Sequence, residues 1–305
     1  MARITSERAY FIKLGRGGEW EKRCLEEGVL RFGYREASHD DCVNGRWEAV
    51  RDFWTSFRDD KGAATRDTNQ IRIYYEAGPE TIFVTFHGGL LYWCRPSAGV
   101  SVDPVDDTRI RQTLDGWHST SIGGDPLRTD RLSGALLRVQ GYRGTICGID
   151  QLAFLLGRIN DELPPAVLAA DEARAAYLSA IEVLIGLLTW RDFELLVDLI
   201  FTGSGWRRLG TVGKTQKSVD LELQLPTTGE VAFIQVKGEA DSSTLQDYIH
   251  RFTSYEKYNR MFFAWHTGSI DVPTDASDVV LLDRSRLARM TLDAGLAAWL
   301  RDKVS

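Results

Sequence analysis

Polar and apolar residues alternate in two neighbouring stretches, residues 218–225 and 230–237, which are separated by the segment Pro-Thr-Thr-Gly. Alternation with a period of two is typical of β-strands, and proline and glycine favour a turn. A hairpin with residues 226–229 in its turn places Leu225 opposite Glu230. This register collects the apolar side chains on one face and therefore predicts that this face packs against the core.

The other face of the predicted hairpin carries polar groups at one end. In the same register Asp220 lies opposite Gln235, about 5 Å away between Cβ atoms, and Lys237 is a diagonal neighbour. A carboxylate, an amide oxygen and an ammonium group therefore converge. Two protein oxygens suit Mg²⁺, which keeps several water ligands, and a lysine beside them can hold or activate a water. The alternative is an exposed sheet face with an incidental ion pair.

Helical and strand-like patterns surround this hairpin in the second half of the chain. Apolar residues recur with helical spacing, and short β-type runs follow. The predicted elements, besides the hairpin, are helices over 171–188, 190–205 and 243–258, strands over 206–212, 260–266 and 278–283, and a closing helical stretch over 284–304. This order predicts a domain of the α/β class, in which helices pack on a sheet.

The first half of the chain has shorter strand-like runs, interrupted by glycines and rich in aromatic residues. The pattern predicts strands within 70–77, 81–96 and 134–149, and helices within 18–30 and 45–60. Pro164 and Pro165 interrupt two helical patterns, so we expect a domain boundary between residues 1–160 and residues 161–305. The N-terminal domain is expected to be α+β, with a strongly bent or barrel-like mixed sheet.

Composition limits the classes of protein to which the chain can belong. Hydrophobic residues make up 43% and charged residues 26%, as in ordinary globular proteins. No apolar run reaches the length of a membrane span, and the first residues lack the apolar stretch of a signal peptide. We therefore expect a cytoplasmic protein without a membrane anchor. The four cysteines are scattered and indicate neither a disulfide framework nor a zinc ribbon.

The net charge of −6 is unevenly distributed. Residues 1–160 hold 22 Lys and Arg against 22 Asp and Glu, whereas residues 161–305 hold 15 against 21. An acidic chain is not an obvious nucleic-acid binder, because lysine and arginine must neutralise the phosphates. Local basic patches or a bound metal would have to compensate.

A short basic segment offers such a patch in the acidic half. The residues that we expect to contact phosphates are Arg207, Arg208, Lys214 and Lys217. The alternative is an ordinary solvated loop.

The order of these segments resembles the PD-(D/E)xK nuclease superfamily. The segments that carry the resemblance are DFELLVDLIFTGSGWRRLG (192–210), SVDLELQL (218–225), FIQVKG (233–238) and DVVLLDRSRLARMTLDAGL (278–296). Glutamine in place of the middle acid is similar to the Mrr-like restriction endonucleases, over roughly residues 185–297. The resemblance implies a central mixed sheet flanked by helices and hydrolysis of phosphodiester bonds.

The resemblance also implies roles for individual residues. Asp220 would be the principal Mg²⁺ ligand, with Mn²⁺ as a substitute, and Gln235 would supply an amide oxygen. Lys237 would position or activate the attacking water, and Glu194 would complete the metal site or orient Lys237. The segment KSVDLEL lacks the glycine that commonly precedes the acid, and Glu222 remains open as a second ligand.

Residues 10–34 loosely resemble the opening of EVE- and PUA-like domains, which are small barrels that read modified or flipped bases. The first half also contains an unusual number of tryptophans, namely Trp20, Trp47, Trp54, Trp93 and Trp117. A flipped base is held by stacking between aromatic side chains, whereas most aromatic residues of any domain belong to its core. We therefore expect residues 1–160 to bind DNA, with a modified base as one candidate target.

These expectations lead to an Mg²⁺-dependent endonuclease acting on double-stranded DNA, of a restriction or phage-defence type. A homodimer is expected, because cutting both strands takes two sites. Two alternatives stay open: a DNA-binding module with an inactive nuclease fold, since Gln235 removes one negative charge from the site, and an RNA or repair nuclease. Cleavage that disappears in Lys237→Ala would separate the nuclease from the binding module.

Overall fold

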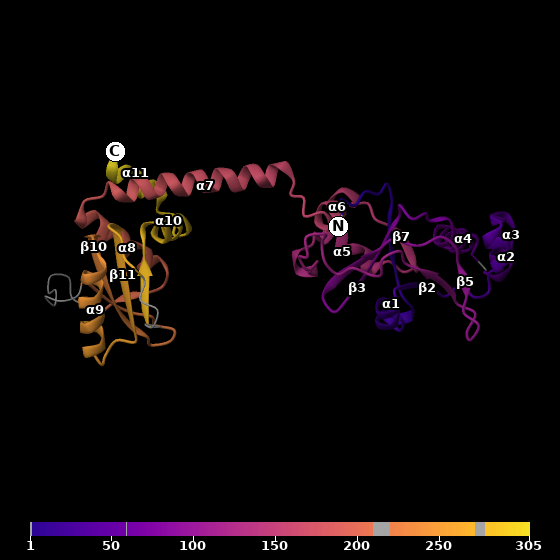
Figure 1. Ribbon diagram of the computed structural model, residues 1–305, viewed down its shortest axis with the longest axis horizontal. Helices are drawn as coiled ribbons and strands as arrows, with labels where there is room; N and C mark the ends of the chain where they lie inside the picture. The colour runs from indigo at the N-terminus through magenta and orange to yellow at the C-terminus, as the bar shows by residue number, and fades with distance from the viewer. Residues whose placement is uncertain (1, 59, 210–219, 272–277) are drawn as a thin grey trace. The chain divides into compact units, whose positions relative to one another are not determined.

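The computed structural model describes residues 2–58, 60–209, 220–271 and 278–305. The chain divides into two units, Met1–Pro165 and Ala166–Ser305 (Figure 1). The division falls at the Pro164-Pro165 pair that interrupts the helical patterns of the sequence. No helix in the described part of the chain combines the length and the apolar character that a membrane span requires.

The first unit contains a four-stranded sheet of order β4-β3-β1-β7 and a three-stranded sheet of order β2-β6-β5. The strands are β1 (Ala9–Ile12), β2 (Val29–Phe32), β3 (Ile82–His87), β4 (Leu90–Cys94), β5 (Ser101–Val102), β6 (Arg109–Gln112) and β7 (Ile146–Gly148). The helices are α1 (Glu21–Glu27), α2 (His39–Val43), α3 (Trp47–Phe57), α4 (Lys61–Glu76), α5 (Gly134–Leu137) and α6 (Leu152–Ile159). Within the described residues these sheets close no barrel, because β2 pairs with β6 rather than with the first sheet, so the expected barrel is wrong.

The strand predicted over residues 70–77 is wrong, because residues 70–76 belong to helix α4 and Ala77 is its C-cap. The side chain of Asp60 caps the helix by accepting the N–H of Gly62. Ile71 and Tyr74 are fully buried on one face of the helix. Burial at helical spacing therefore outweighs the β propensity of the isoleucine and tyrosine residues in this segment.

The other two predicted strand segments have different outcomes. Residues 81–96 form β strands as expected, and β3 and β4 pair as a hairpin in which Gly88 and Gly89 have positive φ angles of 57° and 79°, as a tight two-residue turn requires. Residues 134–149 form a strand only at β7. They begin with helix α5 instead, whose first turn is capped by the hydroxyl of Ser133 accepting the N–H of Leu136.

The second unit is built on one mixed sheet of strand order β12-β11-β10-β9-β8. The strands are β8 (Arg207–Arg208), β9 (Leu221–Gln224), β10 (Val231–Glu239), β11 (Arg260–Thr267) and β12 (Val279–Leu282). The helices are α7 (Pro165–Gly186), α8 (Trp190–Gly203), α9 (Ser242–Ser254), α10 (Arg284–Asp293) and α11 (Ala297–Val304). The central strand β10 is antiparallel to β9 and parallel to β11. The predicted mixed sheet with flanking helices is confirmed.

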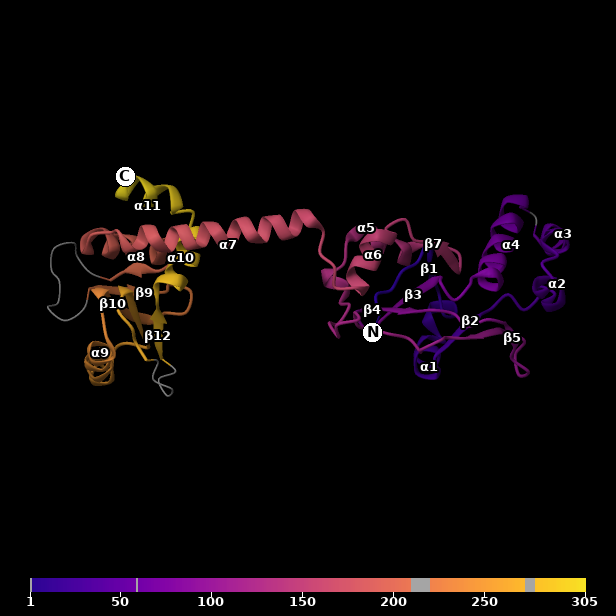
Figure 2. The same cartoon turned by 45° about the horizontal axis from the view of Figure 1, so that its top comes forward.

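Helices cover both faces of this sheet (Figure 2). On one face Leu223 and Ile234 pack against α8 together with side chains of α7, α10 and α11. On the other face Phe233 packs against α9, including Leu245 and Phe252. The polar side of the hairpin is therefore a layer between β10 and α9 and not an open surface.

The predicted register of the hairpin is confirmed. Ile234 pairs with Leu221 and Phe233 pairs with Glu222, and the N–H of Leu225 donates to the carbonyl of Glu230 at 2.9 Å. Side chains of alternate residues then point to opposite faces. The register thus brings the residue before β9 next to the middle of β10.

Candidate catalytic site

Asp220 and Gln235 are in direct contact at the end of the β9–β10 hairpin. The Nε2 group of Gln235 donates a hydrogen bond to Oδ2 of Asp220. The backbone N–H of Val236 donates to the same oxygen at 2.8 Å. Gln235 is 2% exposed and Asp220 is half-buried. The carboxylate is therefore fixed by two donors of the central strand.

The amide oxygen of Gln235 is buried and has no hydrogen-bond partner within the described residues. A buried acceptor without a partner costs about 1–3 kcal/mol, so such groups are rare unless something else satisfies them. The same side chain holds Asp220 through its other amide atom. An unsatisfied oxygen therefore lies beside a fixed carboxylate, an arrangement that a cation would stabilise.

The two carboxylates of the predicted site are costly to ionise. Burial raises the pKa of Asp220 above its ordinary value, although the N–H of Val236 and the charge of Lys237 act in the opposite direction. Burial also raises the pKa of Glu194, and the negative charge of Asp220 adds to this effect. Acids whose pKa is raised by burial and by a like charge are typical of functional sites and gain most from a bound cation.

Lys237 is held by an aromatic side chain that the sequence analysis missed. Its Nζ atom lies over the ring of Tyr248 on α9, 5.4 Å from the ring centroid. The guanidinium of Arg251 lies over the same ring at 4.8 Å. Tyr248 falls in a predicted helix, but only the packing of α9 on β10 shows which helical residue meets Lys237. The ammonium group is thus positioned beside the Asp220–Gln235 pair by a cation–π contact.

Helix α8 contributes a second acid that the sequence analysis also missed. Asp198 follows Glu194 by one helical turn, and its Oδ2 lies 3.7 Å from the guanidinium of Arg208. Its Oδ1 is buried without a hydrogen-bond partner in the described part of the chain. No hydrogen bond joins Glu194 to Asp220 or Lys237 among the described residues, but the charge of Asp220 adds to the rise in the pKa of Glu194 and that of Lys237 opposes it. The sequence contained a signal for Asp198, because residues four positions apart, such as Glu194 and Asp198, lie on the same face of a helix.

Glu222, which the sequence left open as a second metal ligand, has another partner. Its Oε1 accepts a hydrogen bond from Nζ of Lys257 at 2.7 Å. It also lies opposite Phe233, two residues from the Asp220–Gln235 pair along the hairpin. This geometry favours a peripheral ion pair for Glu222.

The predicted basic segment is only partly described. Arg207 and Arg208 form the short edge strand β8 and are exposed. Arg208 is close to Asp198, and its charge partly opposes the rise in the pKa of Glu194 that burial causes. Lys214 and Lys217 lie outside the described residues. Of the four residues expected to contact phosphates, Arg208 therefore lies near the site, next to Asp198 and Glu194 of α8.

The donor set limits which metal the site can take. Nowhere in residues 2–58, 60–209, 220–271 and 278–305 do three or more His, Cys, Asp or Glu side chains gather as metal ligands. Asp220 and Gln235 offer one carboxylate and one unsatisfied amide oxygen. Mg²⁺ binds through one or two protein oxygens and completes its shell with water and phosphate oxygens, so this pair fits Mg²⁺ or Mn²⁺ and does not fit a structural zinc ion.

Comparison with known proteins adds one distant likeness. No family model matches the chain, and no curated protein matches it. A solved structure of MspJI restriction endonuclease in complex with a 27-mer oligonucleotide aligns with 92% of this chain and 74% of its own, at 15% identity and a TM-score of 0.28. A TM-score this low does not establish a common fold, so no residue role is transferred from that protein.

Proposed function

We propose that this protein is a divalent-cation-dependent endonuclease that hydrolyses phosphodiester bonds of DNA at the end of the β9–β10 hairpin. The observation that carries the proposal is the contact between Asp220 and Gln235, which leaves the Gln235 amide oxygen buried and unsatisfied. A purely structural pair has no reason to keep a free acceptor beside a carboxylate whose pKa is raised. A bound cation would satisfy the oxygen and would offset the cost of ionising the buried carboxylate.

Each residue of the site has a distinct task in this proposal. Asp220 and Gln235 hold the cation, which when bound neutralises charge on the phosphodiester. Lys237 donates to a non-bridging phosphate oxygen and positions the attacking water, and Tyr248 fixes the direction of its ammonium group. Glu194 adds negative charge next to this centre and raises its demand for a cation.

The reaction is an in-line displacement at phosphorus. The water oxygen forms a new bond to phosphorus as the bond between phosphorus and the sugar oxygen breaks. The water loses a proton and the departing sugar oxygen gains one. The chain supplies little covalent chemistry, so positioning and electrostatic stabilisation must provide most of the rate enhancement.

DNA as the substrate, and a restriction or phage-defence role, rest on the resemblance of the motif order to Mrr-like endonucleases. The first unit then binds DNA, with a modified base as a candidate target, and a homodimer places two centres on the two strands. Arg208 lies beside Asp198 of α8, and in this proposal Arg207 and Arg208 of the exposed strand β8 contact phosphates.

A DNA-binding module without cleavage is the second candidate function. Gln235 supports it, because a neutral amide replaces a second carboxylate and weakens the attraction of the site for a cation. In this case Asp220 and Gln235 would form only a buried polar contact between two strands.

The test uses matched DNA duplexes that are unmodified, methylated, hydroxymethylated or glucosylated. Wild-type protein and Lys237→Ala are incubated with each duplex in Mg²⁺, Mn²⁺ or EDTA. We expect the wild type to cut at least one duplex only when a cation is present, and Lys237→Ala to bind the same duplex without cutting it. Binding of DNA without cutting in every cation would favour the module, and equal cutting by both proteins would contradict the assigned site.

A further inference from the structure

The first unit contains a pocket of about 850 Å³, which is large enough for a drug-sized or nucleotide-sized ligand. Segments 13–20, 33–36, 54–58 and 143–145 line it, so the chain comes back to the pocket from four distant places. Five cationic side chains and two carboxylates line the pocket. The cations are Lys13, Arg16, Arg35, Arg58 and Arg143. A cationic pocket in a chain of net charge −6 indicates an anionic ligand.

One residue of the lining has a buried indole N–H group without a partner. Trp54 is 1% exposed and lines the pocket, and its Nε1 group finds no hydrogen-bond acceptor in the described residues. In contrast, the indole groups of Trp47, Trp93 and Trp117 donate to Glu76, Thr120 and Val29. A buried tryptophan N–H usually has a partner, so a ligand acceptor is the expected partner of Trp54.

Arg58 is held at the pocket by two contacts. Its guanidinium lies 5.2 Å from the centroid of the Trp54 ring. Its Nε group donates to Oδ2 of Asp67 at 3.0 Å, and Asp67 also accepts the hydroxyl of Tyr34. The arginine therefore has a fixed position before any ligand arrives, which lowers the entropy lost on binding.

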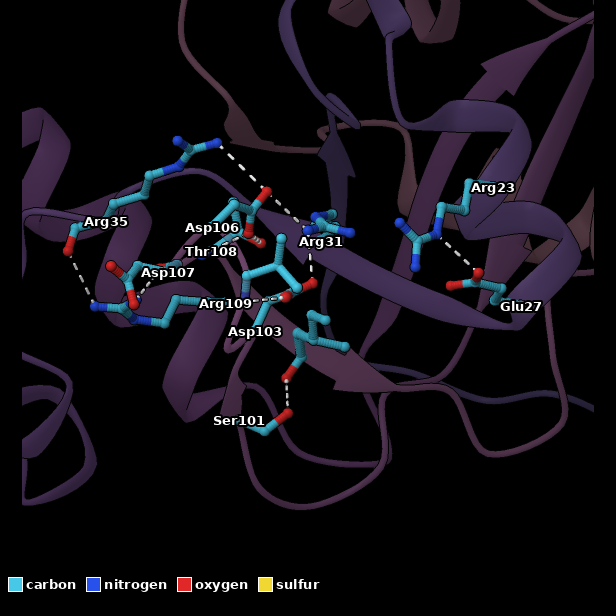
Figure 3. Close-up of polar contacts among 12 residues, drawn as sticks. Arg23, Glu27, Arg31, Arg35, Ser101, Asp103, Asp106, Asp107, Thr108 and Arg109 are labelled. Carbon is cyan, nitrogen blue, oxygen red and sulfur yellow. Dashed lines mark hydrogen bonds and ion pairs between the residues drawn. The ribbon is translucent and has the colours of Figure 1, made fainter.

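An ionic network around the buried Arg31 contacts two residues of the lining, and its polar contacts are drawn in Figure 3. Arg31 donates to Asp103 at 2.7 Å and to Asp106 at 2.9 Å, and Arg35 reaches the same oxygen of Asp106 at 3.5 Å. The guanidinium of Arg31 also lies 5.4 Å from the centroid of the Trp20 ring. Arg31 is thus a positioning residue that orients one aromatic ring and one arginine of the lining.

Two further arginines of the lining are uncommitted. Arg16 and Arg143 are exposed, and neither guanidinium forms an ion pair or hydrogen bond within the described part of the chain. Lys13, by contrast, donates to the carbonyl of Tyr142. The pocket therefore combines aromatic walls with free guanidinium groups, which are the groups that stack on a planar ring and pair with a phosphate.

We propose that this pocket binds one nucleotide, with its base between the aromatic walls and its phosphate at Arg16 and Arg143. The N–H of Trp54 donates to an acceptor on the edge of the base. A nucleotide within a DNA strand and a free nucleotide present the same chemistry to the pocket. This inference therefore rests on the proposed action on DNA only where it concerns the source of the nucleotide. It assigns the pocket as the place where the first unit contacts its ligand.

The test measures binding of the four deoxynucleoside 5′-monophosphates and the matching deoxynucleosides to the full chain by calorimetry. We expect saturable binding of at least one monophosphate, and affinity lower by about tenfold or more for its nucleoside, because the phosphate pairs with arginine. The double variant Arg16→Gln/Arg143→Gln should bind the monophosphate more weakly than the wild type by the same factor. The matched control, Arg131→Gln, removes one exposed arginine of the same unit outside the pocket and should bind like the wild type.

Trp54→Phe separates the contribution of the base to the affinity from that of the phosphate, because it keeps an aromatic ring and removes the N–H group. It should weaken the nucleoside and the nucleotide by the same factor. No saturable binding of any monophosphate, or unchanged affinity in Arg16→Gln/Arg143→Gln, would overturn the nucleotide site whatever Trp54→Phe does.

The source of the nucleotide is tested with oligonucleotides. If Arg16→Gln/Arg143→Gln also weakens duplex or single-stranded DNA, the pocket takes a nucleotide of the strand. If only monophosphates are affected, the pocket takes a free nucleotide. Neither outcome depends on cutting, so loss of the nucleotide site leaves the catalytic proposal standing, and failure of DNA cleavage leaves the nucleotide site standing.

Discussion

The two units build their candidate sites in opposite ways. In the second unit, Asp220, Gln235 and Lys237 lie within 18 consecutive residues, and one hairpin register brings them together. In the first unit, the pocket draws on segments from 13–20 to 143–145, which meet only in the folded domain. A site on one hairpin can therefore be inferred from alternation, whereas a pocket between distant segments requires the tertiary structure.

The electrostatic character of the sites differs as well. The hairpin site collects acids whose pKa is raised, and it needs a cation to relieve them. The pocket of the first unit has an excess of arginine and lysine and needs an anion. In the proposed function the hairpin site cuts a phosphodiester and the pocket holds a nucleotide, so variants of the two sites should affect cutting and binding separately.

The largest expected effect separates cutting from binding. Lys237→Ala should lower the cleavage rate by about 10²–10⁴-fold, because it removes the group that positions the water and stabilises charge, while DNA affinity changes little. The control Lys257→Ala removes a lysine of the same unit that pairs with Glu222. Single-turnover cleavage and fluorescence anisotropy measure the two quantities, and equal loss in both variants would break the assignment.

The next effect tests the demand for a cation. Gln235→Glu places a second carboxylate against Asp220 in a buried position and should lower the free energy of unfolding in EDTA by about 2 kcal/mol or more. Added Mg²⁺ should raise the free energy of unfolding of Gln235→Glu. This increase should be larger than the increase for any variant outside the site.

Gln224→Glu provides the matched control for that experiment, since it makes the same charge change on β9 away from the pair. Thermal unfolding with Mg²⁺ and with EDTA compares the two variants. If Mg²⁺ stabilised them equally, the carboxylates at 220 and 235 would not form a cation site.

A smaller effect, on the pH dependence of the melting temperature, is expected for Asp220→Asn. Burial raises the pKa of Asp220, so the native state keeps a proton that the unfolded chain has already lost. The contribution of Asp220 to stability is therefore present at low pH and is lost as the pH rises through its raised pKa.

Removing this charge should then raise the melting temperature at neutral pH in EDTA, and the gain should vanish toward pH 4. Calorimetric melting curves across this pH range give the comparison. A lower melting temperature at neutral pH would mean that the hydrogen bonds from Gln235 and Val236 outweigh the burial of the charge.

Sequence reasoning recovers those parts of the molecule that depend on local periodicity. The hairpin register and the contact of Asp220 with Gln235 follow from a period of two, because a shift by one residue would place apolar side chains on the wrong face. The helices of the second unit follow from helical spacing in the same way.

Tertiary packing decides the remaining parts. Residues 70–76 have high β propensity but form part of α4, because the buried face of a helix can hold isoleucine and tyrosine. The contact of Tyr248 with Lys237 depends on how α9 crosses β10. The unsatisfied N–H of Trp54 is invisible in the sequence, where Trp54 is equally compatible with a plain core residue.

Binding of Mn²⁺ tests most directly whether the carboxylate and amide at the hairpin form a cation site. Electron paramagnetic resonance reports the fraction of Mn²⁺ held by the protein in the presence of an oligonucleotide that is not cut. We predict that wild type and Glu222→Gln retain bound Mn²⁺ and that Asp220→Asn loses it. Equal binding by wild type and Asp220→Asn, or no bound Mn²⁺ in the wild type, would contradict the proposed centre.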